Sequence, residues 1–125
     1  MDTTMDTTHA STHFTWDELA CRCGCGIRNI CPRAIRKLQR LRDIARSPIM
    51  ISSAARCPQH NARIGGAVQS YHIATPDRPS CAFDVLSAVH DPQRLAGMAE
   101  QAGFRGIGTY HNWVHVDDRS YDARW

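Results

Sequence analysis

The chain has 125 residues, which suits one domain that can bury a hydrophobic core. Its 42% hydrophobic and 22% charged residues are ordinary for a globular protein and argue against a largely disordered chain. No apolar run approaches the roughly 20 residues that a membrane-spanning helix needs, so membrane insertion is not expected. The net charge of +3 is only mildly basic, so we expect no specific nucleic-acid partner.

Residues 1–12 are mostly polar and repeat Met-Asp-Thr-Thr, which predicts a flexible leader before a folded domain over residues 13–125. This leader lacks the apolar core of a signal peptide, so we expect synthesis in the cytoplasm without one. At the start of the domain, Glu18 follows Thr15 by three residues, a spacing that predicts a short helix with a capping box.

Two longer helices are indicated by caps and apolar spacing. Pro32 precedes apolar residues at three- and four-residue steps, which predicts an amphipathic helix of about fifteen residues that ends before Ser47-Pro48. Its five basic residues are expected to form a solvated face, with contact to a polyanion as the less favoured alternative. Asp91-Pro92 and Gly103 predict the start and the end of a second helix.

Strands are predicted at short apolar runs, namely residues 49–51, 82–86, 104–110 and 113–117. Along the last of these, side chains alternate, so His115 and Asp117 share one face while Val114 and Val116 share the other. We expect the valines to face the core, which leaves His115 and Asp117 directed toward a site. Helices around several short strands predict a small single α+β domain with a mostly antiparallel sheet.

Six cysteines is a high number for this length, and four of them fall between Cys21 and Cys31. The CxCxC spacing differs from the CxxC of a usual zinc knuckle, which argues against a structural metal. Three alternatives stay open. They are disulfides from this segment to Cys57 or Cys81, which require an oxidising compartment, free thiols, and a second metal site.

Two imidazoles and one carboxylate stand beside apolar, strand-like residues, at His72, Asp84 and His115. Such a set can bind a catalytic zinc that keeps an open position for water. A single histidine on a strand is more often structural than a ligand, however, and the chain has seven histidines. The residue types alone therefore leave both roles open. Glycines at 106 and 108 are expected to let neighbouring groups approach the adjacent strand closely.

Read together, the surrounding motifs resemble the zinc D-alanyl-D-alanine carboxypeptidase-like peptidases, the M15 family, especially its short peptidoglycan-cleaving and phage-type members. The likeness covers residues 13–125, and its motifs occur in the family's order. They are HFTWDEL at 13–19, LQRLRD at 38–43, ISSAARCPQHN at 51–61, Gly65-Gly66, Ser70-Tyr71-His72, Ala82-Phe83-Asp84, GIGTY at 106–110 and VHVD at 114–117.

The resemblance implies a Zn²⁺ ion with water in its fourth position, bound by His72, Asp84 and His115. The zinc would activate this water for peptide hydrolysis. Arg56 is implied to hold the substrate carbonyl and steady the oxyanion, and Ser70 to hydrogen-bond the substrate. The alternative for Arg56 is a surface ion pair with Asp77 or Asp84.

Two features depart from the family pattern. His72 precedes Asp84 by twelve residues instead of the family's usual spacing of about seven, with Thr75–Ser80 as an insertion. Closing the longer loop costs little additional entropy, so zinc binding is expected to survive. We expect the inserted loop to line the cleft. The second departure is Asn112, which stands where many relatives carry a general-base glutamate. An amide cannot accept the proton.

Asp117 and then His111 are the candidates to replace this base, because a carboxylate near zinc stays ionised at neutral pH. The alternative for Asp117 is to orient His115 through the ring nitrogen that does not face the metal.

We predict a zinc metallopeptidase that hydrolyses peptidoglycan stem peptides or cross-links at a D-alanine bond, as a carboxypeptidase or an endopeptidase. It is expected to be a monomer that acts at the bacterial cell wall, as a phage lysis or virion-associated protein. One rival hypothesis is a catalytically weak relative that binds cell-wall peptide or serves as a structural virion part. The other is a metal-binding adaptor built on the cysteines, with incidental histidines.

Overall fold

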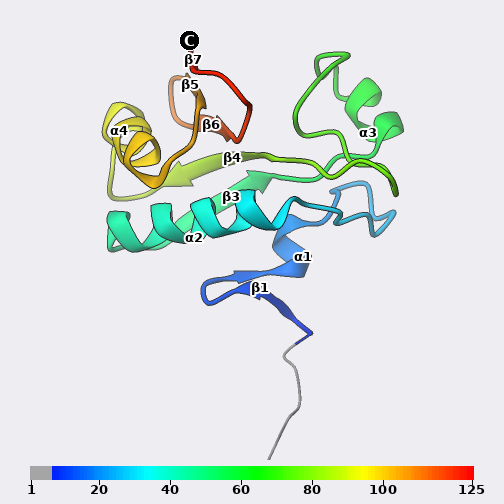
Figure 1. Cartoon of the computed structure of the whole chain (residues 1–125), viewed down its shortest axis with the longest axis horizontal. Coiled ribbons are helices and arrows are strands. Elements are labelled where there is room, and N and C mark those ends of the chain that lie inside the picture. Colours follow the sequence, from blue (N-terminus) through cyan, green and yellow to red (C-terminus); the bar gives the residue numbers. More distant parts are fainter. Residues whose placement is uncertain (1–6) are drawn as a thin grey trace, which may run out of the picture.

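The computed structural model describes residues 7–125, which form a five-stranded sheet with flanking helices (Figure 1). The strands lie in the order β3 (Ile49–Ser53), β4 (Ala82–Ser87), β6 (Val114–Asp117), β5 (Gly106–Thr109) and β7 (Ala123–Arg124). Neighbouring strands are antiparallel, except that β7 pairs parallel with β5. The predicted α+β class with a mostly antiparallel sheet is confirmed.

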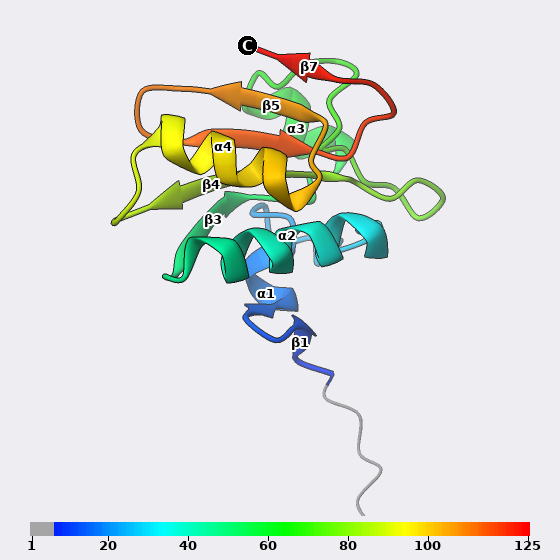
Figure 2. The ribbon, with the colours of Figure 1, turned by 60° about the vertical axis from the view of Figure 1, so that its left-hand side comes forward.

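One face of the sheet is covered by α2 (Pro32–Ala45) and α4 (Pro92–Ala102), which lie side by side in front of it in Figure 2. Their apolar side chains and those of the strands form one buried cluster, in which Leu38, Leu95 and Val116 are almost fully excluded from solvent. Each such side chain contributes about 1.5–3 kcal/mol by leaving water. This face is the core of the domain.

The local signals for the helices are confirmed. Thr15 caps α1 (Trp16–Leu19), and its backbone N–H donates to Glu18 Oε1 over 2.7 Å in the predicted capping box. Helix α2 begins at Pro32, and α4 runs from the Asp91 cap to Gly103. Gly103 has a φ of 102°, a left-handed conformation that glycine adopts without the steric cost of a side chain.

Ordered structure begins within the segment that the sequence predicted as a leader. Strand β1 (His9–Ser11) pairs antiparallel with β2 (Phe14–Thr15), and the Ser11 hydroxyl donates to Gln39 on α2 over 2.8 Å. Part of the predicted leader is therefore joined to the domain, whereas residues 1–6 lie outside the described residues. Within residues 7–125, no helix combines the length and apolar character needed to cross a bilayer.

The opposite face of the sheet carries α3 (Pro58–Arg63), which lies behind the sheet in Figure 2. Irregular chain continues from α3 to β4 and contains the insertion at 75–80. This insertion folds as a turn whose Thr75 carbonyl accepts a hydrogen bond from Asn29 Nδ2 over 2.8 Å. The insertion is thereby fastened to the segment that precedes α2.

Candidate active site

Two adjacent strands bring Asp84 and His115 together on the face away from α2 and α4. The two residues are direct partners in the antiparallel pairing of β4 with β6. The flanking Val114 and Val116 are fully buried in the core, so the alternation of the strand turns His115 to the other face, as predicted. His72 arrives from a turn above this face, where the Ser70 hydroxyl accepts a hydrogen bond from the His72 backbone N–H.

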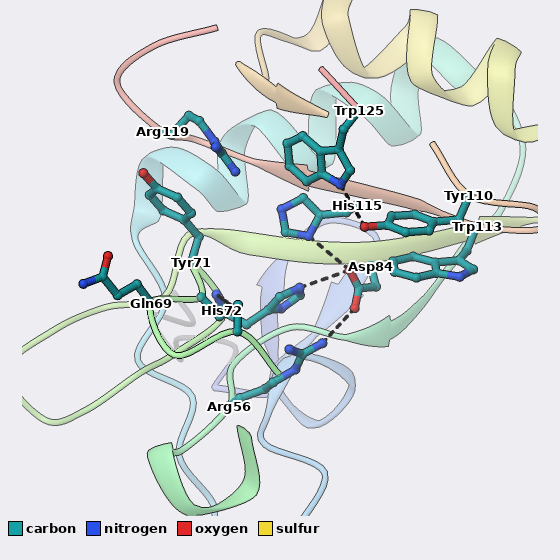
Figure 3. Close-up of a pocket in the computed structure, with 12 residues that line it drawn as sticks. Arg56, Gln69, Tyr71, His72, Asp84, Tyr110, Trp113, His115, Arg119 and Trp125 are labelled. Atoms are coloured by element: carbon teal, nitrogen blue, oxygen red, sulfur yellow. Dashed lines mark hydrogen bonds and ion pairs between the residues drawn. The ribbon is translucent and has the colours of Figure 1, made fainter. Parts of the chain in front are cut away.

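Polar atoms of three side chains converge at this point (Figure 3). Asp84 Oδ1 lies 3.0 Å from His72 Nε2 and 3.3 Å from His115 Nδ1. The two imidazole rings are 5.1 Å apart and meet edge to face. His72 and Asp84 are only 2% and 5% exposed, so water does little to screen them.

Hydrogen bonds on the far side of each ring decide which nitrogen carries hydrogen. His72 Nδ1 lies 2.7 Å from the Ala54 carbonyl, which can only accept, so Nδ1 donates and Nε2 keeps its lone pair. His115 Nε2 lies 2.7 Å from Asp117 Oδ2 and donates in the same way, which leaves the lone pair on Nδ1. Three acceptor atoms therefore face one another, an arrangement that a metal ion or a proton between them would stabilise.

A zinc ion fits this donor set. Two neutral imidazoles and one carboxylate are the protein ligands of many catalytic zinc sites, and partners on the outer ring nitrogens fix the ligands in place. Without a metal, the cation is a proton. Burial opposes protonation of His115, but hydrogen bonds to Asp117 and Asp84 raise its pKa. Burial likewise opposes ionisation of Asp84, yet hydrogen bonds from His115 and His72 hold the pKa of its carboxyl well below the usual value.

Arg56 lies beside this cluster and is held by three contacts. Its Nη2 pairs with Asp84 Oδ2 over 3.0 Å, its Nε donates to Ser53 Oγ over 3.0 Å, and its Nη1 donates to Asn61 Oδ1 over 3.3 Å. A side chain at Gly66 would collide with Asn61, so the glycine makes room for this anchor. The predicted alternative of an ion pair with Asp84 does occur, but the pair is largely buried and not on the surface.

A cavity of about 420 Å³ opens above the cluster, and both Arg56 and Ser70 line it. One wall is aromatic. Tyr110 and Trp113 stack with ring centroids 4.0 Å apart, and Trp125 Nε1 donates to the Tyr110 hydroxyl over 2.8 Å. No role was predicted for these aromatic residues.

A family model described as Peptidase M15 matches residues 12–117, which is most of the chain. The chain belongs to the peptidase M15 family. The resemblance drawn from the sequence motifs is confirmed, and the match indicates that the protein is a peptidase. No curated protein matches the chain. The M15 peptidases are zinc peptidases, and this M15 peptidase holds a histidine, aspartate and histidine set that suits a metal ion.

Asp117 of this M15 peptidase has both oxygens engaged. Arg119 donates to Oδ1 from Nε over 2.8 Å and to Oδ2 from Nη2 over 2.7 Å, while His115 also donates to Oδ2. Burial opposes ionisation, but these partners lower the pKa of Asp117 to about 2. The carboxylate is fully buried and does not line the cavity. This geometry favours the alternative role considered for Asp117, which is to orient the His115 ring.

His111 and the insertion at 75–80 do not line the cavity of the M15 peptidase, although Arg78 Nη2 of the insertion lies 3.5 Å from the carbonyl oxygen of Ser70, a residue that does. His111 is exposed and borders a different depression together with Asn112. None of residues 75–80 is among those that line the cavity, so the expectation that the insertion lines the cleft is wrong. The physical reason is its attachment to Asn29, which draws the turn toward the start of α2.

The C-terminal segment supplies site residues that were not predicted. The Arg119 guanidinium lies over the ring of Tyr71 at 4.5 Å and near that of Trp125 at 4.9 Å. Gly106 makes room for the Asp117–Arg119 pair, and Gly108 makes room for the Trp125 indole. The prediction that these glycines permit close approach is confirmed. It was the one feature of the sequence that pointed to groups packed against β5.

Proposed function

We propose that this M15 peptidase is a zinc-dependent hydrolase of peptidoglycan stem peptides or cross-links, cutting at a bond that involves D-alanine. The observation that carries the proposal is the convergence of three acceptor atoms, from His72, Asp84 and His115, on a point where they could hold a cation. The family match supports a peptidase reaction at this site. A metal-binding adaptor with incidental histidines does not account for that convergence.

The residues of the chain have separable tasks in this reaction. A zinc ion held by the three ligands would polarise the scissile carbonyl and lower the pKa of a bound water. Ala54 and Asp117 hold the outer ring nitrogens, so both histidines present lone pairs toward the metal position.

Arg56 is suited to hold a substrate oxygen. Three of its five N–H groups have partners among residues 7–125, which leaves two for a carbonyl or carboxylate of the peptide. The Ser70 oxygen accepts from the backbone of its own turn, so its hydroxyl hydrogen stays available to a substrate carbonyl. A fixed cation beside an aromatic wall suits a short peptide with small side chains, such as one that ends in alanine.

A second candidate is a catalytically weak protein that binds cell-wall peptide. Asp84 is the sole side-chain carboxylate among the described residues that line the cavity, and it is already a metal ligand in our proposal. A dedicated general base typically contributes about 10²- to 10⁴-fold to the rate, so its loss would leave slow turnover. We propose that the protein acts at the bacterial cell wall in either case, as a monomeric phage lysis or virion-associated protein.

Digestion of purified peptidoglycan, followed by mass spectrometry of the muropeptides, tests the proposal. We expect the zinc-loaded protein to release terminal alanine or to open cross-links, and we expect this product to vanish in His115→Ala and with a chelator. His111→Ala is the matched control, because His111 lies outside the cavity, and it should retain full activity. Equal product from wild type, His115→Ala and the chelated protein would refute the proposal. Binding to peptidoglycan without cleavage would favour the second candidate.

A further inference from the structure

Four cysteine sulfurs form a second cluster, apart from the histidines. Cys21, Cys23 and Cys25 lie on the loop that follows α1, and Cys57 caps the start of α3. All four sulfurs lie within 4.8 Å of one another. Two chain segments that are distant in sequence therefore meet at these thiols.

The spacing of the sulfurs separates a metal site from a disulfide. Cys21 Sγ lies 3.5 Å from Cys23 Sγ, which in turn lies 3.7 Å from Cys57 Sγ. A tetrahedral zinc with Zn–S bonds of about 2.3 Å places its sulfurs about 3.8 Å apart. A disulfide needs about 2.05 Å. Every cysteine is a free thiol, and the two short sulfur–sulfur distances are close to the edge of a zinc–thiolate tetrahedron.

The backbone around the cluster is shaped to present these sulfurs. Gly24 and Gly26 have φ values of 86° and 85°, which allow the loop to curl around its own cysteines. The Cys57 backbone N–H points at Cys21 Sγ over 3.4 Å, and the N–H of His60 points at Cys57 Sγ over 3.3 Å. Such donors favour a negatively charged sulfur, which is the form that binds metal.

Arg22 fixes the same loop to the sheet. Its guanidinium donates to the backbone carbonyls of Glu18 over 2.8 Å and of Ile51 over 2.7 Å. The loop is thereby placed against the end of β3 before any metal binds. Cys23 and Cys25 are nevertheless exposed, so a bound ion would be reached from solvent.

We propose that Cys21, Cys23, Cys25 and Cys57 bind a structural zinc ion as four thiolates. Four protein ligands close the coordination sphere and leave no position for water or substrate, which distinguishes this site from the histidine site. Each thiol releases its proton to solvent as the ion binds. The CxCxC spacing alone argued against such a site because it differs from the CxxC of a usual zinc knuckle, but the structure adds Cys57 as a fourth sulfur.

The site has a consequence for the cavity. Cys57 directly follows Arg56, and α3 also carries Asn61, which anchors the Arg56 guanidinium. A zinc ion at the thiolates would therefore hold the segment that carries the substrate-binding arginine. The proposal concerns metal at sulfur, so it stands or falls independently of the peptidase activity.

Metal analysis of purified full-length protein, kept reduced, tests the proposal. We expect two zinc ions per wild-type chain and one each in His72→Ala and Cys23→Ser. Cys31→Ser is the matched control, because Cys31 lies outside the cluster, and it should keep both ions. Equal metal loss in Cys23→Ser and Cys31→Ser would overturn the assignment.

X-ray absorption of zinc in the His72→Ala protein supplies a test that does not depend on folding of a cysteine variant. We expect a shell of four sulfurs at about 2.3 Å. Cobalt in place of zinc should likewise give thiolate charge-transfer absorption. A metal-free His72→Ala protein, a nitrogen and oxygen shell around its zinc, or disulfides among these four cysteines in the protein as purified would each refute the proposal.

Discussion

Replacement of Asp117 by Asn separates the two roles considered for this residue. Asp117 Oδ2 accepts hydrogen bonds from His115 Nε2 and from Arg119 Nη2, and Asp117 Oδ1 accepts one from Arg119 Nε. The amide of Asn has one oxygen and one NH₂ group in place of the two carboxylate oxygens. Its NH₂ group must therefore face hydrogen-bond donors where one of the two oxygens had accepted. If it faces His115, the imidazole moves its hydrogen to Nδ1, the atom that faces Asp84, and loses its lone pair for the metal.

The size of the effect follows from this geometry. Partners that orient a metal-ligating histidine typically contribute about 10- to 100-fold in metal affinity, and we expect a loss of that size in Asp117→Asn. Saturating zinc should then restore turnover to within about tenfold of wild type, because the ion itself favours the correct tautomer. Were Asp117 the general base instead, affinity would stay unchanged while turnover at saturating zinc fell by about 10²- to 10⁴-fold.

A zinc titration against a chelating indicator measures the affinity, with the metal bound by the His72→Ala protein subtracted. Turnover is measured on peptidoglycan at saturating zinc. Asp118→Asn is the matched control, since Asp118 pairs with Lys37 and Arg33 and does not contact His115. Unchanged affinity together with lost turnover in Asp117→Asn would refute our assignment of this residue.

Three further substitutions test the aromatic wall of the cavity, helix α4 and the hydrophobic core. Gly108→Ala is expected to displace the Trp125 indole, because the added Cβ would lie 2.3 Å from its Nε1, and so to lower turnover; a wild-type rate would show that this wall is dispensable. Gly97→Ala, inside α4 and with open space around it, should raise the free energy of unfolding in urea by about 0.5–1 kcal/mol, and a decrease would contradict this. Leu38→Ala should lower it by about 2–5 kcal/mol, whereas no change would exclude Leu38 from the core.

Local chemistry explains which parts of the fold were predictable. The capping box at Thr15, Pro32 at the start of α2, and the Asp91 cap of α4 each depend on residues within one helical turn, so the sequence carries them in full. The face of the sheet on which His115 lies could be predicted, because its side chain alternates along the strand with that of the core residue Val114. Strands β1, β2 and β7 were missed, because two or three residues are too few to show a period.

The site was only partly predictable, because much of it depends on contacts between distant segments. The three metal-ligand candidates came from motifs that resemble the family, and the structure brings them together. The sequence left Cys57 and Cys81 as alternative partners of the CxCxC segment, because residue spacing does not decide between them, and the structure brings Cys57 to it. Arg119 and Trp125 reach the cavity because β7 pairs parallel with β5, a contact that no local pattern encodes.

The reaction that we propose requires zinc between His72, Asp84 and His115. Crystals grown with zinc, measured on both sides of the zinc absorption edge, locate the ion directly through its anomalous scattering. We predict a peak bounded by Nε2 of His72, Nδ1 of His115 and the Asp84 carboxylate. A map with no peak at this position, in crystals soaked to saturation with zinc, would contradict the account.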